Sequence, residues 1–196
     1  LRFTINFIPM KTVIYNSPRQ GFWRKLIFAI LVLLIFNQCK KDSPEEINEE
    51  EVINRVTLRV TASDNTTTNY TWNDGEAIPS IGLTANASYA VSVHFFDASD
   101  ASDIEDITEE VIEEADEHFI FYEIATANVS ISPASNDVED NDGVSINLKT
   151  QWTTADASSG SVRLYLIHEP NNKAGSTRGA IGGATDVEIS FPVTVE

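Results

Sequence analysis

Carboxylates are concentrated immediately before a histidine near the middle of the chain. Carboxylate oxygens together with neutral imidazole nitrogens suit Zn²⁺ and related divalent ions. Glutamates four residues apart repel one another on a helix, and a bound cation would relieve that repulsion. The run contains no HExxH spacing, so a solvated charged surface is the alternative interpretation. The predicted metal ligands are Glu110, Glu113, Glu114, Glu117, His118 and, brought near by the fold, His168.

A second acidic segment, residues 135–143, has oxygen-bearing side chains at alternate positions. Asp137, Glu139 and Asn141 have the spacing at which a calcium-binding loop supplies its oxygen ligands. Gly143 comes one position later than the glycine of an EF-hand loop, and no glutamate follows at the twelfth position. The segment therefore predicts either a calcium site or a solvated turn.

A long glycine-rich connection, residues 169–185, is the third candidate for binding. It carries Lys173 and Arg178 in a part of the chain where cations are rare. Loops of this length in compact domains often bind ligands. Neither GxGxxG nor GxxxxGK occurs, so no phosphate-binding motif is present. The connection is interpreted either as a ligand loop or as a passive link.

Signals for catalysis are weak. The chain has no GxSxG motif and no pairing of a histidine with a nucleophile that is diagnostic of an enzyme. Pairs of carboxylates are so abundant that a glycosidase-like site is neither indicated nor excluded. We therefore expect a protein that is not an enzyme, with a carboxylate-based hydrolase as an alternative.

The only cysteine, Cys39, follows an apolar run that is preceded by Arg24 and Lys25. A basic start followed by a short apolar run is the layout of a secretory signal, and the run is too short for a typical membrane span. We predict a lipoprotein signal peptide at residues 1–38, whose true start is Met10. A lipid on Cys39 and an acidic tether over residues 39–51 would then hold the remaining residues at a membrane.

The chain is strongly acidic, with 13 basic and 30 acidic residues. Eight basic residues and all 30 acidic residues lie after the predicted signal peptide, which gives that part a net charge of −22. Such a charge repels nucleic acid and anionic lipid headgroups, so contact with a membrane is expected through the lipid anchor alone. No cysteine remains for a disulfide, and the fold must depend on packing.

Alternation of apolar and polar residues predicts β-strands through most of residues 52–196. The inward sets begin with Val52, Val56, Leu58 and Val60 and end with Val187 to Val195. Residues 144–152 show the same alternation. Residues 119–124 are apolar at both parities, which predicts a central strand covered on two faces. Pro192 indicates that the last strand lies at an edge.

Helical spacing occurs in one place, residues 104–115. Ile104, Ile107, Val111 and Ile112 recur on one side, and Ser102 with Glu105 resembles a capping box. Short strands with turns between them and one short inserted acidic helix predict an all-β fold. We expect an antiparallel Ig-like β-sandwich of about seven or eight strands over residues 52–196.

Four stretches carry a resemblance to a known family. They are EEINEEEVINRVTLRVT (45–61), DITEEVIEEADEHFIFYE (106–123), SSGSVRLYLIHEPNNK (158–173) and GGATDVEISFPVTV (182–195). Together they resemble small Bacteroidota outer-membrane lipoproteins labelled as a type 1 periplasmic binding fold superfamily, whose genes often lie near TonB-dependent receptors. The resemblance implies an envelope lipoprotein associated with nutrient uptake.

The residues and the resemblance together lead to one expected function. We expect a lipid-anchored, non-catalytic binding lipoprotein of the outer membrane, on its periplasmic or outer face, that assists TonB-dependent uptake of a nutrient or metal. Calcium or zinc is the candidate cofactor, and a TonB-dependent receptor is the candidate partner. A structural or adhesion module is the alternative from another class, and the oligomeric state is left open.

Overall fold

The computed structural model describes residues 52–196 of the chain. The predicted signal peptide, Cys39 and the tether lie outside the described residues. Clustering of contacts separates Leu1–Asn48 from Glu49–Glu196, and the described residues of the second unit contain a hydrophobic core. Glu49–Glu196 is therefore a compact unit by its own internal contacts.

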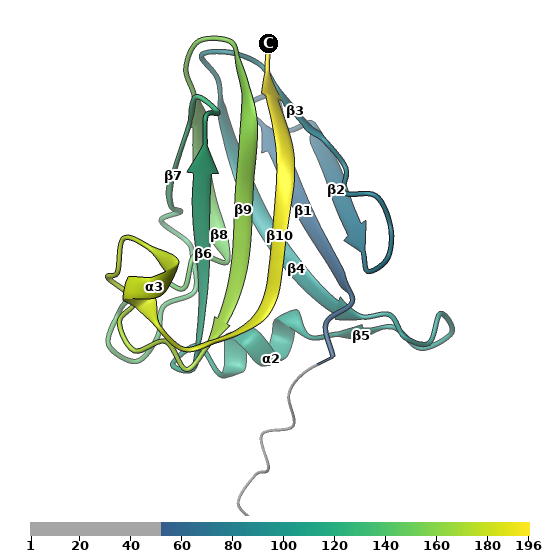
Figure 1. The fold of residues 1–196 in the computed structure, drawn as a ribbon, viewed down its shortest axis with the longest axis vertical. Helices are drawn as coiled ribbons and strands as arrows, with labels where there is room; N and C mark the ends of the chain where they lie inside the picture. The colour runs from purple at the N-terminus through teal and green to yellow at the C-terminus, as the bar shows by residue number, and fades with distance from the viewer. Residues whose placement is uncertain (1–51) are drawn as a thin grey trace, which may run out of the picture. The chain divides into compact units, whose positions relative to one another are not determined.

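The first sheet contains six strands (Figure 1). Five of them follow the order β2-β1-β4-β8-β7, and β5 pairs with the last two residues of β4, on the same edge as β8 and beyond its pairing. Every pairing in this sheet is antiparallel. The strands are β1 (Arg55–Ala62), β2 (Thr67–Asn73), β4 (Ser88–Asp97), β5 (Glu105–Asp106), β7 (Val129–Pro133) and β8 (Lys149–Thr154).

The second sheet contains four strands in the order β3-β10-β9-β6. They are β3 (Ile81–Leu83), β6 (His118–Ala125), β9 (Ser158–His168) and β10 (Ala184–Val195). β3 is parallel to β10, whereas β9 is antiparallel to both β10 and β6. The last strand, β10, lies between β3 and β9, so the prediction that it is an edge strand was wrong. The short β3 pairs only with Val193–Val195, however, and Pro192 lies just beyond that pairing, where a missing N–H donor is tolerated.

One hydrophobic core lies between the inner faces of the two sheets. Trp152 and Phe95 from the first sheet and Phe191 from the second are each 0% exposed. Tyr122 of β6 meets Trp152 of β8 edge to face, with ring centroids 6.1 Å apart, and so joins the sheets directly. The prediction of a mainly β fold with antiparallel sheets is confirmed. The described residues form ten strands and two short helices, however, rather than seven or eight strands and one helix.

The helix prediction is correct for only part of its length. The helix α2 (Thr108–Glu113) has six residues, and β5 occupies the preceding positions. Ser102 does not cap it, because both its backbone N–H and its hydroxyl donate to Asp100. Ile107 and Val111 are buried, but Ile104 and Ile112 are 45% and 40% exposed. Only two of the four isoleucine and valine residues therefore fasten the helix to the core.

The strand β6 is an edge strand, and the prediction that it is central was wrong. Its second apolar face belongs to a small separate cluster on the outer side of the sheet. There Phe119 and Phe121 pack with Tyr165, Ile167 and Ile181. Ile181 comes from the helix α3 (Arg178–Ile181), which lies over that face (Figure 1). Residues 119–124 are therefore apolar at both parities because α3 covers the outer face of β6, and not because β6 is a central strand.

Two ends of predicted strands also differ from the structure. Val52 is 57% exposed and precedes β1, although Val56, Leu58 and Val60 are buried as expected. Val144 is 41% exposed, and β8 starts only at Lys149. The irregular segment between Val144 and β8 still buries Ile146 and Leu148, because their backbone carbonyl groups accept hydrogen bonds from β6 and β4. No helix among residues 52–196 combines the length and the apolar character that a membrane span requires.

A close backbone approach at Gly160 gives a prediction for stability. A Cβ atom there would collide with the Ala125 carbonyl oxygen and the Ala127 nitrogen, which belong to the backbone at the end of β6. We expect Gly160→Ala in residues 49–196 to lower the free energy of unfolding by about 2 kcal/mol or more, measured by urea denaturation.

The matched control is Gly82→Ala, also in a strand. A Cβ atom at Gly82 would meet no atom within 4 Å, and its φ is not positive. Alanine there restricts the unfolded chain at no steric cost, so stability should stay equal or rise slightly. Equal losses in the two variants would contradict the steric explanation.

Candidate metal site and the loops that hold it

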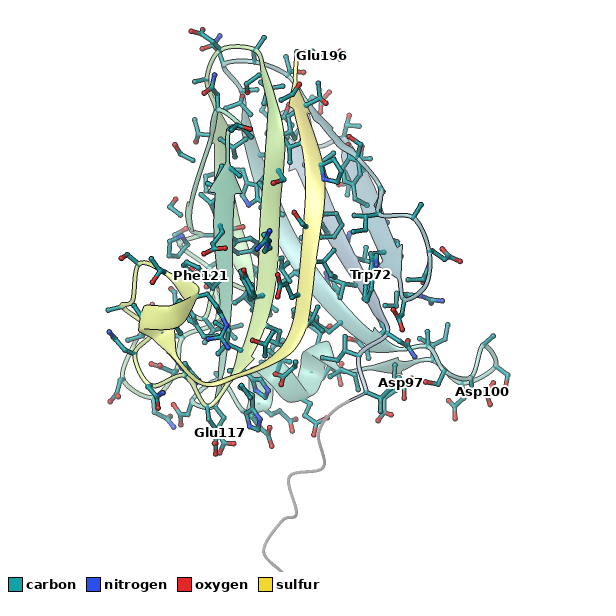
Figure 2. The ribbon with its side chains drawn as sticks, in the orientation of Figure 1. Trp72, Asp97, Asp100, Glu117, Phe121 and Glu196 are labelled. Carbon is teal, nitrogen blue, oxygen red and sulfur yellow. The ribbon has the colours of Figure 1, made fainter. Side chains whose placement is uncertain are left out.

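Two histidines meet at one end of the second sheet. His118 is the first residue of β6 and His168 is the last of β9, and the antiparallel register makes them direct partners. Their rings stack with centroids 5.2 Å apart and planes inclined by 15°. The pairing brings together positions that are separated by fifty residues in the sequence. Glu117 lies beside them at the same end of the molecule as Asp97 and Asp100, opposite Glu196 (Figure 2).

His118 is the buried member of this pair, at 1% exposure. Its Nδ1 lies 3.2 Å from the Glu114 carbonyl oxygen, which accepts a hydrogen bond from the ring. Burial lowers the pKa of His118, and the nearby His168 lowers it further, whereas the bond to Glu114 partly offsets the effect. The ring is therefore neutral near pH 7 and supports His168 by stacking rather than by charge.

Glu117, His168 and Glu169 form the group with metal-binding geometry among the described residues. One ligand atom from each lies within 4.8 Å of the other two. His168 Nε2 is 3.5 Å from Glu117 Oε2. Both glutamates are exposed and the histidine is partly exposed, so rotation of the two carboxylates can close the set around one ion. One imidazole and two carboxylates suit a transition ion such as Zn²⁺ better than Ca²⁺, which prefers oxygen alone.

The backbone fixes the two turns that carry these ligands. The Glu169 N–H donates to the Glu117 carbonyl oxygen over 2.7 Å. Glu169 has φ +48°, an uncommon conformation for a residue other than glycine. Gly183 lies against the carbonyl oxygens of His168 and Glu169, where a Cβ atom would collide. The turn after β9 is therefore held by its neighbours on both sides.

The sequence-predicted metal ligands are only partly brought together. Glu117 and His168 belong to the group, and His118 stacks on it. Glu110 and Glu113 lie on the exposed side of α2. Sequence reasoning missed Glu169, although its position directly after the histidine that ends a strand was an available signal.

Two of the three predicted calcium ligands, Asp137 and Asn141, have side-chain hydrogen bonds within the protein. The Asp137 carboxylate accepts the backbone N–H groups of Asn147 at 2.7 Å and Lys149 at 2.6 Å. Partial burial raises the pKa of Asp137, and these hydrogen bonds partly offset the rise. Asn141 donates both its backbone and its side-chain N–H to Asp116. Glu139 lies in an isolated bridge with Ser145. Asp137 thus fastens the loop to the start of β8.

Lys173 joins three separate loops. Its Nζ donates to the Ala115 carbonyl oxygen at 2.7 Å and to Asp140 Oδ2 at 2.8 Å. The Lys173 and Asp140 side chains are only 11% and 7% exposed. The bond from Lys173 lowers the pKa of Asp140, so the Asp140 carboxylate is ionised at neutral pH. We call these contacts of Lys173 with Ala115 and Asp140 the Lys173 clamp. They connect the turn after α2, the acidic segment 135–143 and the loop after β9.

Arg178, the other cation of the predicted ligand loop, also makes contacts within the loop. It donates to the carbonyl oxygens of Gly182, Gly183 and Ala184 at 2.6 to 3.0 Å. These bonds fold the segment after β9 back onto itself and close the loop beside the histidines. A ligand-binding role for either cation stays a prediction.

Comparisons of the chain with protein-family models, with curated proteins and with solved structures found no match.

The Lys173 clamp gives a second prediction. Lys173→Gln leaves the nearly buried Asp140 carboxylate without its cation, so the free energy of unfolding should fall by about 2 kcal/mol. Urea denaturation of residues 49–196 at pH 7 measures the loss.

Arg163→Gln is the matched control, because it removes the same charge from an exposed ion pair. Arg163 and Glu188 lie 3.5 Å apart, with side chains 45% and 51% exposed. Exposed pairs contribute little to stability, so the loss should be clearly smaller than in Lys173→Gln. If the free energy of unfolding falls as much in Arg163→Gln as in Lys173→Gln, the Lys173 clamp contributes no more to stability than an exposed ion pair.

Proposed function

We propose that this protein is a lipid-anchored, non-catalytic binding lipoprotein of the bacterial outer membrane, with an Ig-like sandwich, that assists TonB-dependent uptake. The anchor is supported by the basic start, the short apolar run and the lone Cys39. The association with a TonB-dependent receptor rests on the resemblance of residues 45–195 to Bacteroidota lipoproteins. The acidic surface fits a role in which cations or basic partners are attracted.

The observation that carries the binding role is the group formed by Glu117, His168 and Glu169. A transition ion held by three protein ligands keeps at least one position open for water or another donor. The carboxylates are exposed at the ends of strands, so an ion can enter and leave without any opening of the core. Exchange of this kind suits capture and delivery of a divalent ion, and we propose Zn²⁺ as the ion.

The metal proposal predicts binding that depends on His168. Residues 49–196 should bind Zn²⁺ in isothermal titration calorimetry, and His168→Ala should weaken the affinity by more than about tenfold. Even the loss of a group that only supports a metal ligand costs 10- to 100-fold. Ca²⁺ should bind more weakly than Zn²⁺, because one of the three ligands is a nitrogen.

Glu113→Gln is the control for general attraction by the acidic surface. Glu113 lies on the exposed side of α2 and is not a member of the group, so its loss should leave the Zn²⁺ affinity nearly unchanged. Equal weakening in Glu113→Gln and His168→Ala would mean that Zn²⁺ is held by diffuse charge. An absence of Zn²⁺ binding would reject the metal proposal.

The anchor proposal predicts the location of a Cys39 variant. In a Gram-negative host, Cys39→Ala should move the protein from the membrane pellet to the soluble fraction, because no lipid can then be attached. Separation should be followed by immunoblot after washes with salt and with carbonate. Gln38→Ala is the control and should remain in the pellet. Retention of Cys39→Ala in the washed pellet would reject the anchor without bearing on Zn²⁺ binding.

A further inference from the structure

Two cations flank a serine on the outer face of the first sheet. Arg59 of β1 pairs with Ser92 of β4, and Ser92 pairs in turn with Lys149 of β8. Val60, Val91 and Thr150, their neighbours along the strands, are buried, so Arg59, Ser92 and Lys149 point away from the core. The three strands lie side by side in the sheet (Figure 1). Strands are spaced by about 4.8 Å, which places the two cationic residues about 10 Å apart on either side of Ser92.

A groove of 270 Å³ lies over this row. Arg59, Ser92 and Lys149 line it, together with Thr61 and Asn136. No carboxylate lines the groove, although residues 52–196 contain 24 acidic and only 6 basic residues. The groove therefore has two of the six cations of the described domain and none of its negative charges. It is a positively charged site on an acidic protein.

The other four cations of the described domain are used within the protein. Lys173 and Arg178 hold loops, Arg163 pairs with Glu188, and Arg55 donates to Asn73. Within residues 52–196, by contrast, the structure gives neither the Arg59 nor the Lys149 side chain an ion pair or a hydrogen bond. Asp137 lies near Lys149, but its carboxylate accepts backbone N–H groups, including that of Lys149. The side-chain donors of Arg59 and Lys149 remain available to a ligand.

His94 lies two residues after Ser92 on β4, next to the row, and does not itself line the groove. Its Nε2 is 3.2 Å from the Ser92 hydroxyl oxygen. Partial burial lowers the pKa of His94, and the charges of Arg59 and Lys149 lower it further, while Asp106 acts in the opposite direction. His94 is therefore neutral at pH 7. When its proton is on Nε2, the ring donates to the Ser92 oxygen and leaves the Ser92 hydroxyl hydrogen for a ligand, while Arg59 and Lys149 supply the positive charge.

We propose that this groove binds the phosphate or sulfate group of an anionic ligand, held between Arg59 and Lys149 over Ser92. The planar guanidinium of Arg59 can donate two parallel hydrogen bonds to a tetrahedral oxyanion. Lys149 supplies a second charge from the opposite side, and the Ser92 hydroxyl can donate from the floor. The site lies on the outer face of the first sheet and does not involve the candidate metal ligands of the second.

The test is a titration of ¹⁵N-labelled residues 49–196 with inorganic phosphate and with sulfate, followed by NMR at constant ionic strength. Saturable shifts at the Arg59, Ser92 and Lys149 amides are expected, and chloride should not produce them. Arg59→Gln and Lys149→Gln should each raise the dissociation constant for phosphate by about tenfold or more, because each removes a charge-assisted hydrogen bond.

Arg163→Gln controls for net charge, since it removes one positive charge from the other sheet. The Arg163→Gln variant should bind phosphate with the same affinity as the unchanged protein. The unaltered parts of each spectrum report whether a variant is folded. The absence of saturable shifts, or equal weakening in Arg163→Gln and Arg59→Gln, would overturn the proposal.

Vesicles distinguish the two sources of a phosphate group. Residues 49–196 should be sedimented with phosphatidylcholine vesicles, with and without phosphatidic acid. Sedimentation that requires phosphatidic acid and is lost in Arg59→Gln would assign the phosphate to a lipid headgroup. A response to inorganic phosphate without sedimentation would assign it to a soluble phosphorylated or sulfated ligand. Either result supports the groove as an anion site.

Discussion

The apolar contact between two sheets holds this domain together. Its only cysteine lies outside residues 52–196, so no disulfide strengthens the described fold. Burying one large apolar side chain contributes about 1.5–3 kcal/mol, and Trp152, Phe95 and Phe191 meet between the sheets. Because successive side chains of a strand point to opposite faces, filling this core sends every second residue outward. Most polar side chains of the described residues therefore lie on the outer faces and in the loops at the ends of the strands, although Thr150 and Thr154 of β8 are buried.

At one end of the sheets, this constraint places the two histidines together. His118 starts β6 and His168 ends β9, so the register that aligns the core residues also aligns the rings. The Lys173 clamp and the bonds of Arg178 then hold the surrounding loops in place. The acidic surface is consequently not uniform. At this end, carboxylates are organised around histidine and lysine, whereas α2 displays its glutamates to solvent.

The few cations show how charge is distributed in an acidic domain. Four of the six contact protein groups, where a positive charge offsets a carboxylate or satisfies a carbonyl or amide oxygen. Arg59 and Lys149 instead share a groove from which carboxylates are absent. The domain thus presents two oppositely charged surfaces. One end with carboxylates and histidine suits a metal ion, and the outer face of the first sheet suits an anion.

The sequence by itself determined which residues form the core, because period-two alternation identifies one face of a strand whatever its partner is. Val56, Leu58 and Val60, and the alternate residues from Val187 to Val195, were predicted in this way and are buried. Helical spacing was less reliable, since Ile104 and Ile112 fit the pattern yet remain exposed. Only the tertiary structure decided that β6 is an edge strand, that Glu169 joins His168, and that Arg59, Ser92 and Lys149 form one row. These facts depend on which strands pair and in which register, and pairing between distant segments leaves no periodic signal in either segment alone.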